Sequence, residues 1–165
     1  MHSPSPQPRA SARVLLGCVE VAGRVVAIDV AQLREVLRWA PPTELPGAPA
    51  LIEGVIDLRG VLVPVVDLGR ALGGERLRPG RRTRIAVAEV DGLVVGLVVD
   101  AAVEILAVDG SSIGGPPPLA MQAGCEATRA VVRRPGAAPI AVLALEVVLE
   151  GLTRSALAQA AEGGS

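Results

Sequence analysis

The 165-residue sequence contains no phenylalanine and no tyrosine, and its only tryptophan is Trp39. Its single histidine is His2, and all sixteen basic residues are arginine. A histidine base or metal ligand inside the fold is therefore excluded, as are a Schiff-base lysine and the lysine of a phosphate-binding loop. With one aromatic side chain, the sequence also lacks the stacking platforms on which proteins hold bases or sugars.

Charge and hydrophobic runs exclude further classes. The net charge is −1, so we expect no nucleic-acid partner. The richest apolar run, 93–99, is too short to span a membrane, so we expect no direct membrane insertion. Residues 1–12 have no apolar core and predict a disordered tail, not a secretory signal. Cys18 and Cys125 fit unpaired buried thiols of a cytoplasmic protein, and a disulfide between them is the alternative.

The residues that are present favour strands and turns. Half of the chain is apolar, mostly valine, leucine, alanine and isoleucine, with nineteen glycines and fourteen prolines. Tight hairpin turns are predicted at Arg59-Gly60, between strands 55–58 and 61–66, and at Asp91-Gly92. We count about ten short strands, which predicts an all-β fold with short helices, arranged as two small barrels side by side.

Three helical segments are expected between and after these strands. Apolar residues at helical spacing predict a short helix over 30–37. Asp67 is placed to cap a second helix over 68–72, and 145–151 predicts a final turn or two. The hydrophilic segment 73–82 is interpreted as a linker that divides the two lobes.

Two charged residues and the tryptophan stand out as candidates for binding. Arg59 occupies a turn that needs glycine but not arginine, so it is either a binding residue or an ordinary solvated turn residue. Glu35 falls on the polar side of the expected helix, where a solvated charge is the simpler alternative. Trp39 lies at a proline-rich boundary and is either a core residue or an exposed anchor.

Other polar groups indicate weaker alternatives. Asp57 and Asp67 suggest a hydrolytic carboxylate pair, but these residues and Asp100 lie near strand ends, where aspartate usually caps a turn or helix. The cysteines have no histidine to activate them as nucleophiles. The five arginines within 76–84 suggest phosphate contact, yet a solvated, flexible link is the better interpretation.

The segment PGAPALIEGVIDLRGVLVPVVDLGRAL resembles the signature of the CheW-like family, a Pro-x-x-Pro stretch, an Asn-Leu-Arg-Gly turn and a Pro-x-x-Asp-Leu segment. The matching positions are Pro46, Pro49, Gly54, Leu58, Arg59, Gly60, Pro64, Asp67 and Leu68. The sequence departs at Asp57, where asparagine is usual. AIDVAQLREVLRW and VVGLVVDAAVEIL also resemble the family, so the likeness spans Arg13 to Leu152.

The resemblance implies one domain over 13–152, built from two five-stranded, SH3-like barrels, with a tail over 153–165. It implies a protein without catalytic activity or cofactor that bridges the cytoplasmic tip of chemoreceptors to the regulatory domain of a CheA-type histidine kinase, in the cytoplasm at membrane-associated arrays. A scaffold of another chemosensory pathway, for surface motility or development, is the alternative. The residues implied in partner contact are Leu33, Glu35, Val36, Gly54, Arg59, Gly60 and Ile105.

Overall fold

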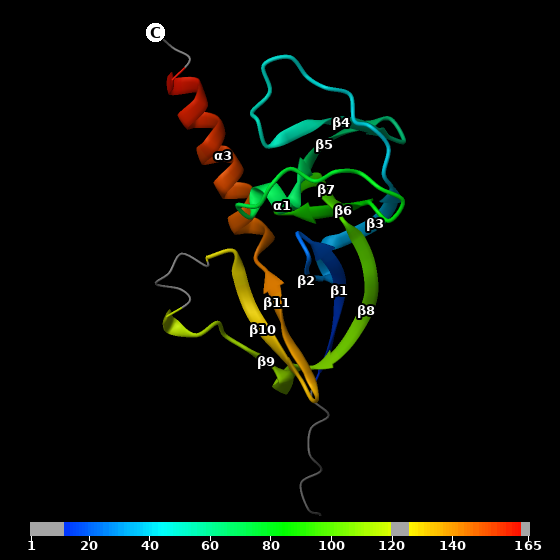
Figure 1. Cartoon of the computed structure of the whole chain (residues 1–165), viewed down its shortest axis with the longest axis vertical. Coiled ribbons are helices and arrows are strands. Elements are labelled where there is room, and N and C mark those ends of the chain that lie inside the picture. The colour runs from blue at the N-terminus through cyan, green and yellow to red at the C-terminus, as the bar shows by residue number, and fades with distance from the viewer. Residues whose placement is uncertain (1–11, 120–125, 163–165) are drawn as a thin grey trace, which may run out of the picture.

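A computed structural model describes residues 12–119 and 126–162, which form two β-sheets and a long carboxyl-terminal helix (Figure 1). The six-stranded sheet runs in the order β8-β1-β2-β11-β10-β9 and the five-stranded sheet in the order β3-β6-β7-β5-β4. The first consists of β1 (Arg13–Val21), β2 (Arg24–Asp29), β8 (Ala101–Asp109), β9 (Ile113–Gly114), β10 (Thr128–Arg134) and β11 (Ala137–Leu143). The second consists of β3 (Leu33–Arg38), β4 (Ile52–Leu58), β5 (Val61–Asp67), β6 (Arg84–Val90) and β7 (Leu93–Val99). The mainly β fold in two lobes is as predicted, with six strands instead of five in one lobe.

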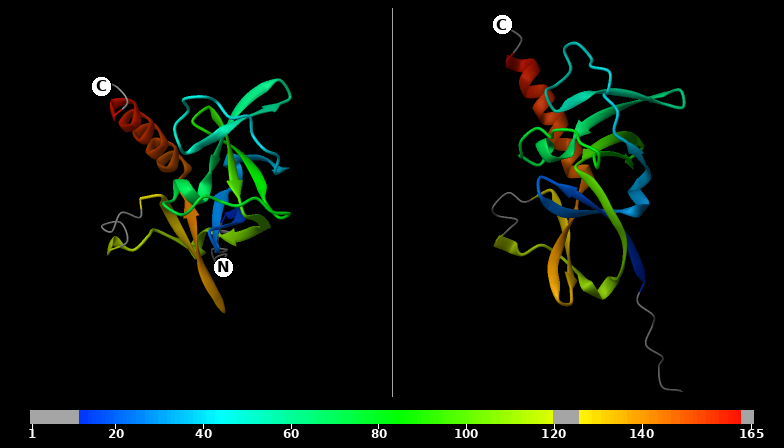
Figure 2. Two further views of the ribbon diagram at one scale, coloured as in Figure 1. Left: turned by 45° about the horizontal axis from the view of Figure 1, so that its top comes forward. Right: turned by 45° about the vertical axis from the view of Figure 1, so that its right-hand side comes forward.

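The two lobes do not correspond to the two halves of the chain. Strands β3 to β7 all lie in the five-stranded lobe, which is inserted between β2 and β8 of the other lobe (Figure 2). The segment 73–82 connects two elements of that same lobe. The prediction that it divides the lobes is therefore wrong. Its polar composition marks a loop, and local composition carries no information on which strands pair across the chain.

The predicted hairpins are confirmed. Strands β4 and β5 pair around Arg59-Gly60, and β6 and β7 pair around Asp91-Gly92. Arg59 and Gly60 have φ values of 52° and 86°, as the two central residues of a tight hairpin turn require. The Asp57 side chain accepts a hydrogen bond from the Gly60 amide at 2.8 Å. Aspartate therefore supplies the acceptor for this turn although asparagine is usual in the family.

The expected helix over 30–37 is wrong for most of its length. Only Val30–Gln32 is helical, as a single 3-10 turn that Asp29 caps by accepting from the Ala31 amide. Leu33–Arg38 is strand β3, in which half-buried and exposed residues alternate. Pairing of β3 with β6, almost fifty residues further along the chain, overrides the local helical spacing.

The helices that follow are closer to expectation. Helix α1 spans Leu68–Ala71, and Asp67 caps it by accepting from the Arg70 amide at 3.2 Å. Helix α3 spans Leu145–Glu162, so the predicted final turn or two is an 18-residue helix that continues into the expected tail. It leaves the end of β11 and runs past α1 alongside the five-stranded lobe (Figure 1). No helix in the described part of the chain is long and apolar enough to cross a membrane.

The core is built from branched aliphatic side chains, as the lack of phenylalanine and tyrosine demands. The largest cluster joins the two lobes and includes Ile28, Leu68, Leu97 and Leu145, each 1% exposed or less. Cys18 is a buried free thiol in the core of the six-stranded lobe. Burial, together with the nearby Glu104 carboxylate, raises its pKa above the ordinary value. Because Cys18 is free, the alternative disulfide is not formed in this structure. Cys125 and residues 1–11 lie outside the described residues, so the predicted amino-terminal tail stays a prediction.

Candidate functional site

Two of the predicted site residues form an ion pair. Arg59, at the β4–β5 turn, donates from Nη2 to Glu35 Oε1 and from Nη1 to Glu35 Oε2 at 3.5 Å. Glu35 lies on β3, and not on a helix as expected. Its carboxylate accepts hydrogen bonds from the guanidinium and adds its own charge, which raises the pKa of Arg59 above its ordinary value. The pair fixes an arginine that is itself largely exposed.

The position of this pair shows how the five-stranded sheet is curled. β3 is at one edge of the sheet and β4 is at the other. A side-chain contact between β3 and the end of β4 requires the two edges to approach each other. The Glu35–Arg59 pair therefore bridges the ends of the sheet and holds the β4–β5 tip beside β3.

Two apolar site residues lie close to Gly17, where the lobes adjoin. A Cβ atom on Gly17 of β1 would lie 2.6 Å from Leu33 Cδ1 and 4.0 Å from Ile105 Cδ1. Leu33 belongs to the five-stranded lobe and Ile105 to β8 of the six-stranded lobe, and Ile105 is 63% exposed. Because Gly17 has no side chain, Leu33 of the five-stranded lobe can pack against β1 of the six-stranded lobe. Sequence reasoning missed Gly17, although a glycine inside the apolar strand LLGCV was a signal of close approach.

The remaining site residues have different roles in the structure. Val36, adjacent to Glu35, is exposed. Gly54 is buried at a φ of 151°, and a Cβ there would overlap the carbonyl oxygen of Thr43. It allows Thr43 to pair with Val55 through two backbone hydrogen bonds of 2.9 Å. Gly60 supplies the turn conformation. Val36 follows Glu35 on β3 and therefore points to the opposite face of the strand. We define the inter-lobe surface as Leu33, Glu35, Arg59 and Ile105.

A second exposed apolar surface was not predicted. Strands β5 and β7 run parallel, so they start at the same end of the sheet, directly after the two tight turns. Leu62 is 69% exposed and Leu93 is 65% exposed at these starts, with Val61 exposed beside them. Val61 precedes Leu62 on β5 and points to the opposite face of the strand, so we name Leu62 and Leu93 the hairpin-tip surface. The only signal of this surface in the sequence was the pair of apolar residues that follows each hairpin turn. The pattern of apolar residues does not show that these side chains are exposed.

The aspartates have structural roles. Asp57 accepts from the Gly60 amide, Asp100 from the Ala22 amide at 2.7 Å, and Asp67 from the Arg70 and Leu77 amides. Asp57 lies beside the start of β5 and Asp67 at its end. They do not form a carboxylate pair, so the hydrolase alternative has no site in this structure.

The arginine-rich segment is anchored, against the expectation of a flexible link. Asp67 Oδ2 accepts from the Leu77 amide at 2.7 Å, and the buried Thr83 hydroxyl accepts from the Gly80 amide at 2.8 Å. Arg76 pairs with Glu53 and Arg82 with Glu20. Asp67 and Glu53 thus hold the first part of the segment to the five-stranded lobe, and Glu20 on β1 ties Arg82 to the six-stranded lobe.

Comparison with known proteins agrees with this geometry. A family model described as "CheW-like domain" matches residues 16–152. The chain belongs to the CheW-like domain family. Among relatives, the chemotaxis protein CheW of Rhizobium meliloti is 40% identical over 100 residues, covering 61% of this chain and 64% of that protein, just under two thirds. Protein FrzA of Myxococcus xanthus is 34% identical over 119 residues, covering 72% and 74% of the two chains.

The crystal structure of the scaffolding protein TtCheW from Thermoanaerobacter tengcongensis has the same CheW-like fold. It superimposes with a TM-score of 0.74 at 27% identity, covering 84% of this chain and 94% of that one. The resemblance inferred from the sequence motifs is therefore confirmed, and with it the two-lobed β architecture.

Proposed function

We propose that this CheW-like chain is a non-enzymatic adaptor that couples chemoreceptors to a CheA-type histidine kinase, in the cytoplasm at membrane-associated receptor arrays. The observation that carries the proposal is the presence of two differently composed exposed surfaces on one CheW-like fold. The inter-lobe surface combines an oriented guanidinium with apolar side chains. The hairpin-tip surface is apolar.

The composition of each surface suits a different partner. A receptor tip is a helical hairpin, and the inter-lobe surface offers apolar side chains and one fixed arginine to an amphipathic helix face. The hairpin-tip surface resembles the apolar centre of a contact between two folded domains. We therefore assign the inter-lobe surface to the receptor tip and the hairpin-tip surface to the regulatory domain of the kinase.

The bridging role is tested by simultaneous binding. The chain is titrated with a purified kinase regulatory domain, alone and in the presence of a saturating receptor-tip fragment, and each affinity is measured by calorimetry. We expect micromolar dissociation constants and a ternary complex, as in transient signalling interfaces. Array stability would then come from multivalency. Strict mutual exclusion of the two partners would refute bridging.

The pathway in which the adaptor works is a separate question. The similarity to FrzA favours a second candidate function, a scaffold of another chemosensory pathway. FrzA matches a larger share of this chain than the R. meliloti CheW does, at 72% against 61%. The same adaptor role could therefore serve a chemosensory pathway other than swimming chemotaxis. Deleting the gene and comparing swimming with surface motility discriminates between the two, because only the pathway that uses the adaptor should lose its response.

A further inference from the structure

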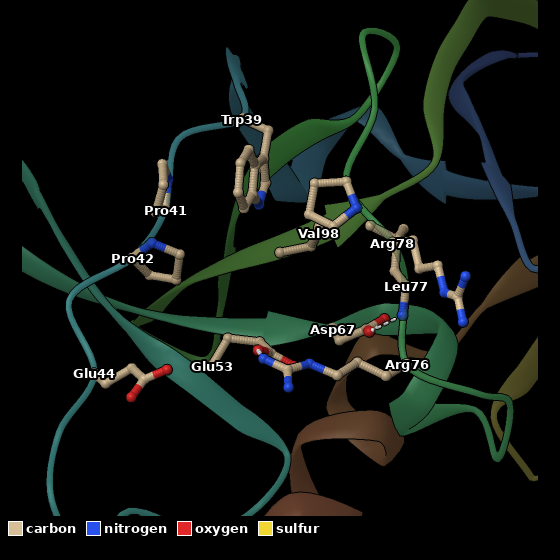
Figure 3. Close-up of a pocket in the computed structure, with 11 residues that line it drawn as sticks. Trp39, Pro41, Pro42, Glu44, Glu53, Asp67, Arg76, Leu77, Arg78 and Val98 are labelled. Carbon is tan, nitrogen blue, oxygen red and sulfur yellow. Dashed lines mark hydrogen bonds and ion pairs between the residues drawn. The ribbon is translucent and has the colours of Figure 1, made fainter.

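A pocket of about 360 Å³ lies in the five-stranded lobe (Figure 3), and none of the residues that line it belongs to the two surfaces described above. Trp39, half-buried, forms one wall, and Pro41, Pro42 and Pro79 add rigid apolar sides. Trp39 is thus neither fully core nor a free surface anchor. The pocket also has carboxylates, from Glu44 on the loop before β4 and Glu53 on β4. An aromatic wall beside carboxylates is the combination that holds organic cations.

Glu53 has capacity for another hydrogen bond. Its side chain is only 15% exposed, and Oε2 accepts from Arg76 at 2.8 Å. Its other oxygen, Oε1, is buried and accepts no hydrogen bond. A buried carboxylate oxygen without a donor costs free energy, and a native structure rarely leaves one unexplained. Glu44 is exposed and has no partner among the described residues.

The other charged groups that line the pocket do not supply a hydrogen-bond donor to Glu53 Oε1. Asp67 already accepts from two backbone amides. Arg78 points away from the pocket in Figure 3. Arg76 reaches Glu53 from the side of the pocket opposite Trp39 in this view, by a single hydrogen bond, and its side chain is 66% exposed. An exposed arginine held by one contact is easily displaced.

We propose that this pocket binds an arginine side chain of a partner protein. The incoming guanidinium displaces Arg76, lies against the face of Trp39, and donates to both oxygens of Glu53, with Glu44 adding charge at the entrance. Guanidinium is favoured over ammonium because its planar fork matches a carboxylate bidentately and stacks on an indole ring. The site is independent of the inter-lobe and hairpin-tip surfaces, so its test does not depend on the adaptor role.

Trp39 is the reporter for the test, because the chain has no other tryptophan and no tyrosine. The full chain is titrated with N-acetyl-arginine methylamide and, separately, with the neutral isostere N-acetyl-citrulline methylamide, while tryptophan fluorescence is recorded. We expect a saturable change with a Kd of about 1–10 mM for the arginine compound alone. Equal responses to the two compounds, or no saturation, would overturn the proposal.

Two variants should move the affinity in opposite directions. Glu53→Gln removes the charge and should weaken binding about tenfold or more. Arg76→Ala vacates the carboxylate and should tighten binding about threefold, a gain that a purely structural role of these residues would not produce. Glu150→Gln, which removes another carboxylate paired with an arginine, on α3, is the matched control and should change nothing. Melting curves confirm that each variant is folded.

Weakened binding in Arg76→Ala would show that Arg76 helps to form the site and would overturn displacement. Free arginine serves as the last comparison. If it bound a hundredfold more tightly than the blocked compound, the pocket would be a small-molecule site and the assignment to a partner protein would be wrong.

Discussion

Arg59, at the tip of the β4–β5 hairpin, forms an ion pair with Glu35 on β3, the strand at the opposite edge of the same sheet. The contact holds a guanidinium in one orientation on an exposed part of the molecule. Exposed ion pairs contribute little to folding stability, because water and salt screen them. An oriented guanidinium is more useful for recognition than for stability.

Replacing Arg59 should therefore impair receptor binding far more than folding. Arg59→Asn is the suitable change, because asparagine tolerates the positive φ of this turn. We expect at least about a tenfold loss of affinity for the receptor-tip fragment, as for loss of a charged hydrogen bond, and a nearly unchanged melting temperature. Arg34→Asn is the control, since Arg34 also pairs with a glutamate, Glu89, on this lobe.

A charge exchange tests the pairing itself. The double variant Glu35→Arg, Arg59→Glu should recover part of the binding that either single change removes. Stability lost by several kcal/mol in Arg59→Asn, with affinity of the folded protein unchanged, would show that the pair serves the fold instead.

The hairpin-tip surface should carry the kinase contact. Leu62→Asp and Leu93→Asp place a charge on side chains that are mostly exposed in the free chain, so folding should be preserved. We expect each to weaken kinase-domain binding by about 1–3 kcal/mol, as loss of an apolar interface centre does. Affinity for the receptor tip, measured in parallel, should stay the same. An equal loss of affinity for both partners would contradict the assignment of the two partners to separate surfaces.

Gly54 should be intolerant of any side chain. At a φ of 151° and in contact with Thr43, it has no room for a methyl group. We expect Gly54→Ala to lower the free energy of unfolding by about 2 kcal/mol or more, measured by urea denaturation. Gly115→Ala is the matched control, because a Cβ there meets nothing within 4 Å. Equal stability of the two variants would show that the Thr43 loop moves freely.

Asp67 should control access to the arginine-rich segment. Asp67→Ala leaves the Leu77 and Arg70 amides without their acceptor, so we expect a loss of about 1–3 kcal/mol in stability. Trypsin should then cut faster after Arg76, Arg81 and Arg82 than it does in the unaltered chain. Asp67→Asn keeps one acceptor oxygen, so its rate of cleavage should lie between those of Asp67→Ala and the unaltered chain. Unchanged cleavage would mean that other contacts suffice to hold the segment.

Cys18 should be unreactive while the protein is folded. Its raised pKa keeps the thiolate fraction below that of a free cysteine at the same pH, and burial blocks access. In a Cys125→Ser variant, labelling by a disulfide reagent at pH 8 should follow the rate of unfolding and accelerate in urea. Fast labelling of the folded variant would contradict the buried position.

Local chemistry alone determined several features of this protein. Arg59-Gly60 and Asp91-Gly92 specify their hairpins, because few residue pairs accept two positive φ values in succession. Asp67 specifies its helix cap, and the lack of aromatics specifies an aliphatic core. The ordered set of motifs between Arg13 and Leu152, with the segment from Pro46 to Leu72 at its centre, indicated the CheW-like family.

The tertiary structure decided what depends on contacts between distant segments. Val36 sits opposite Ala86, and this pairing makes a strand of a segment whose spacing favours a helix. Insertion of the five-stranded lobe between β2 and β8, the Glu35–Arg59 pair across a curled sheet, and the exposure of Leu62 and Leu93 depend likewise on which strands meet. Hydrophobic periodicity reports only which side of one element is buried, so none of these relationships can be read from it.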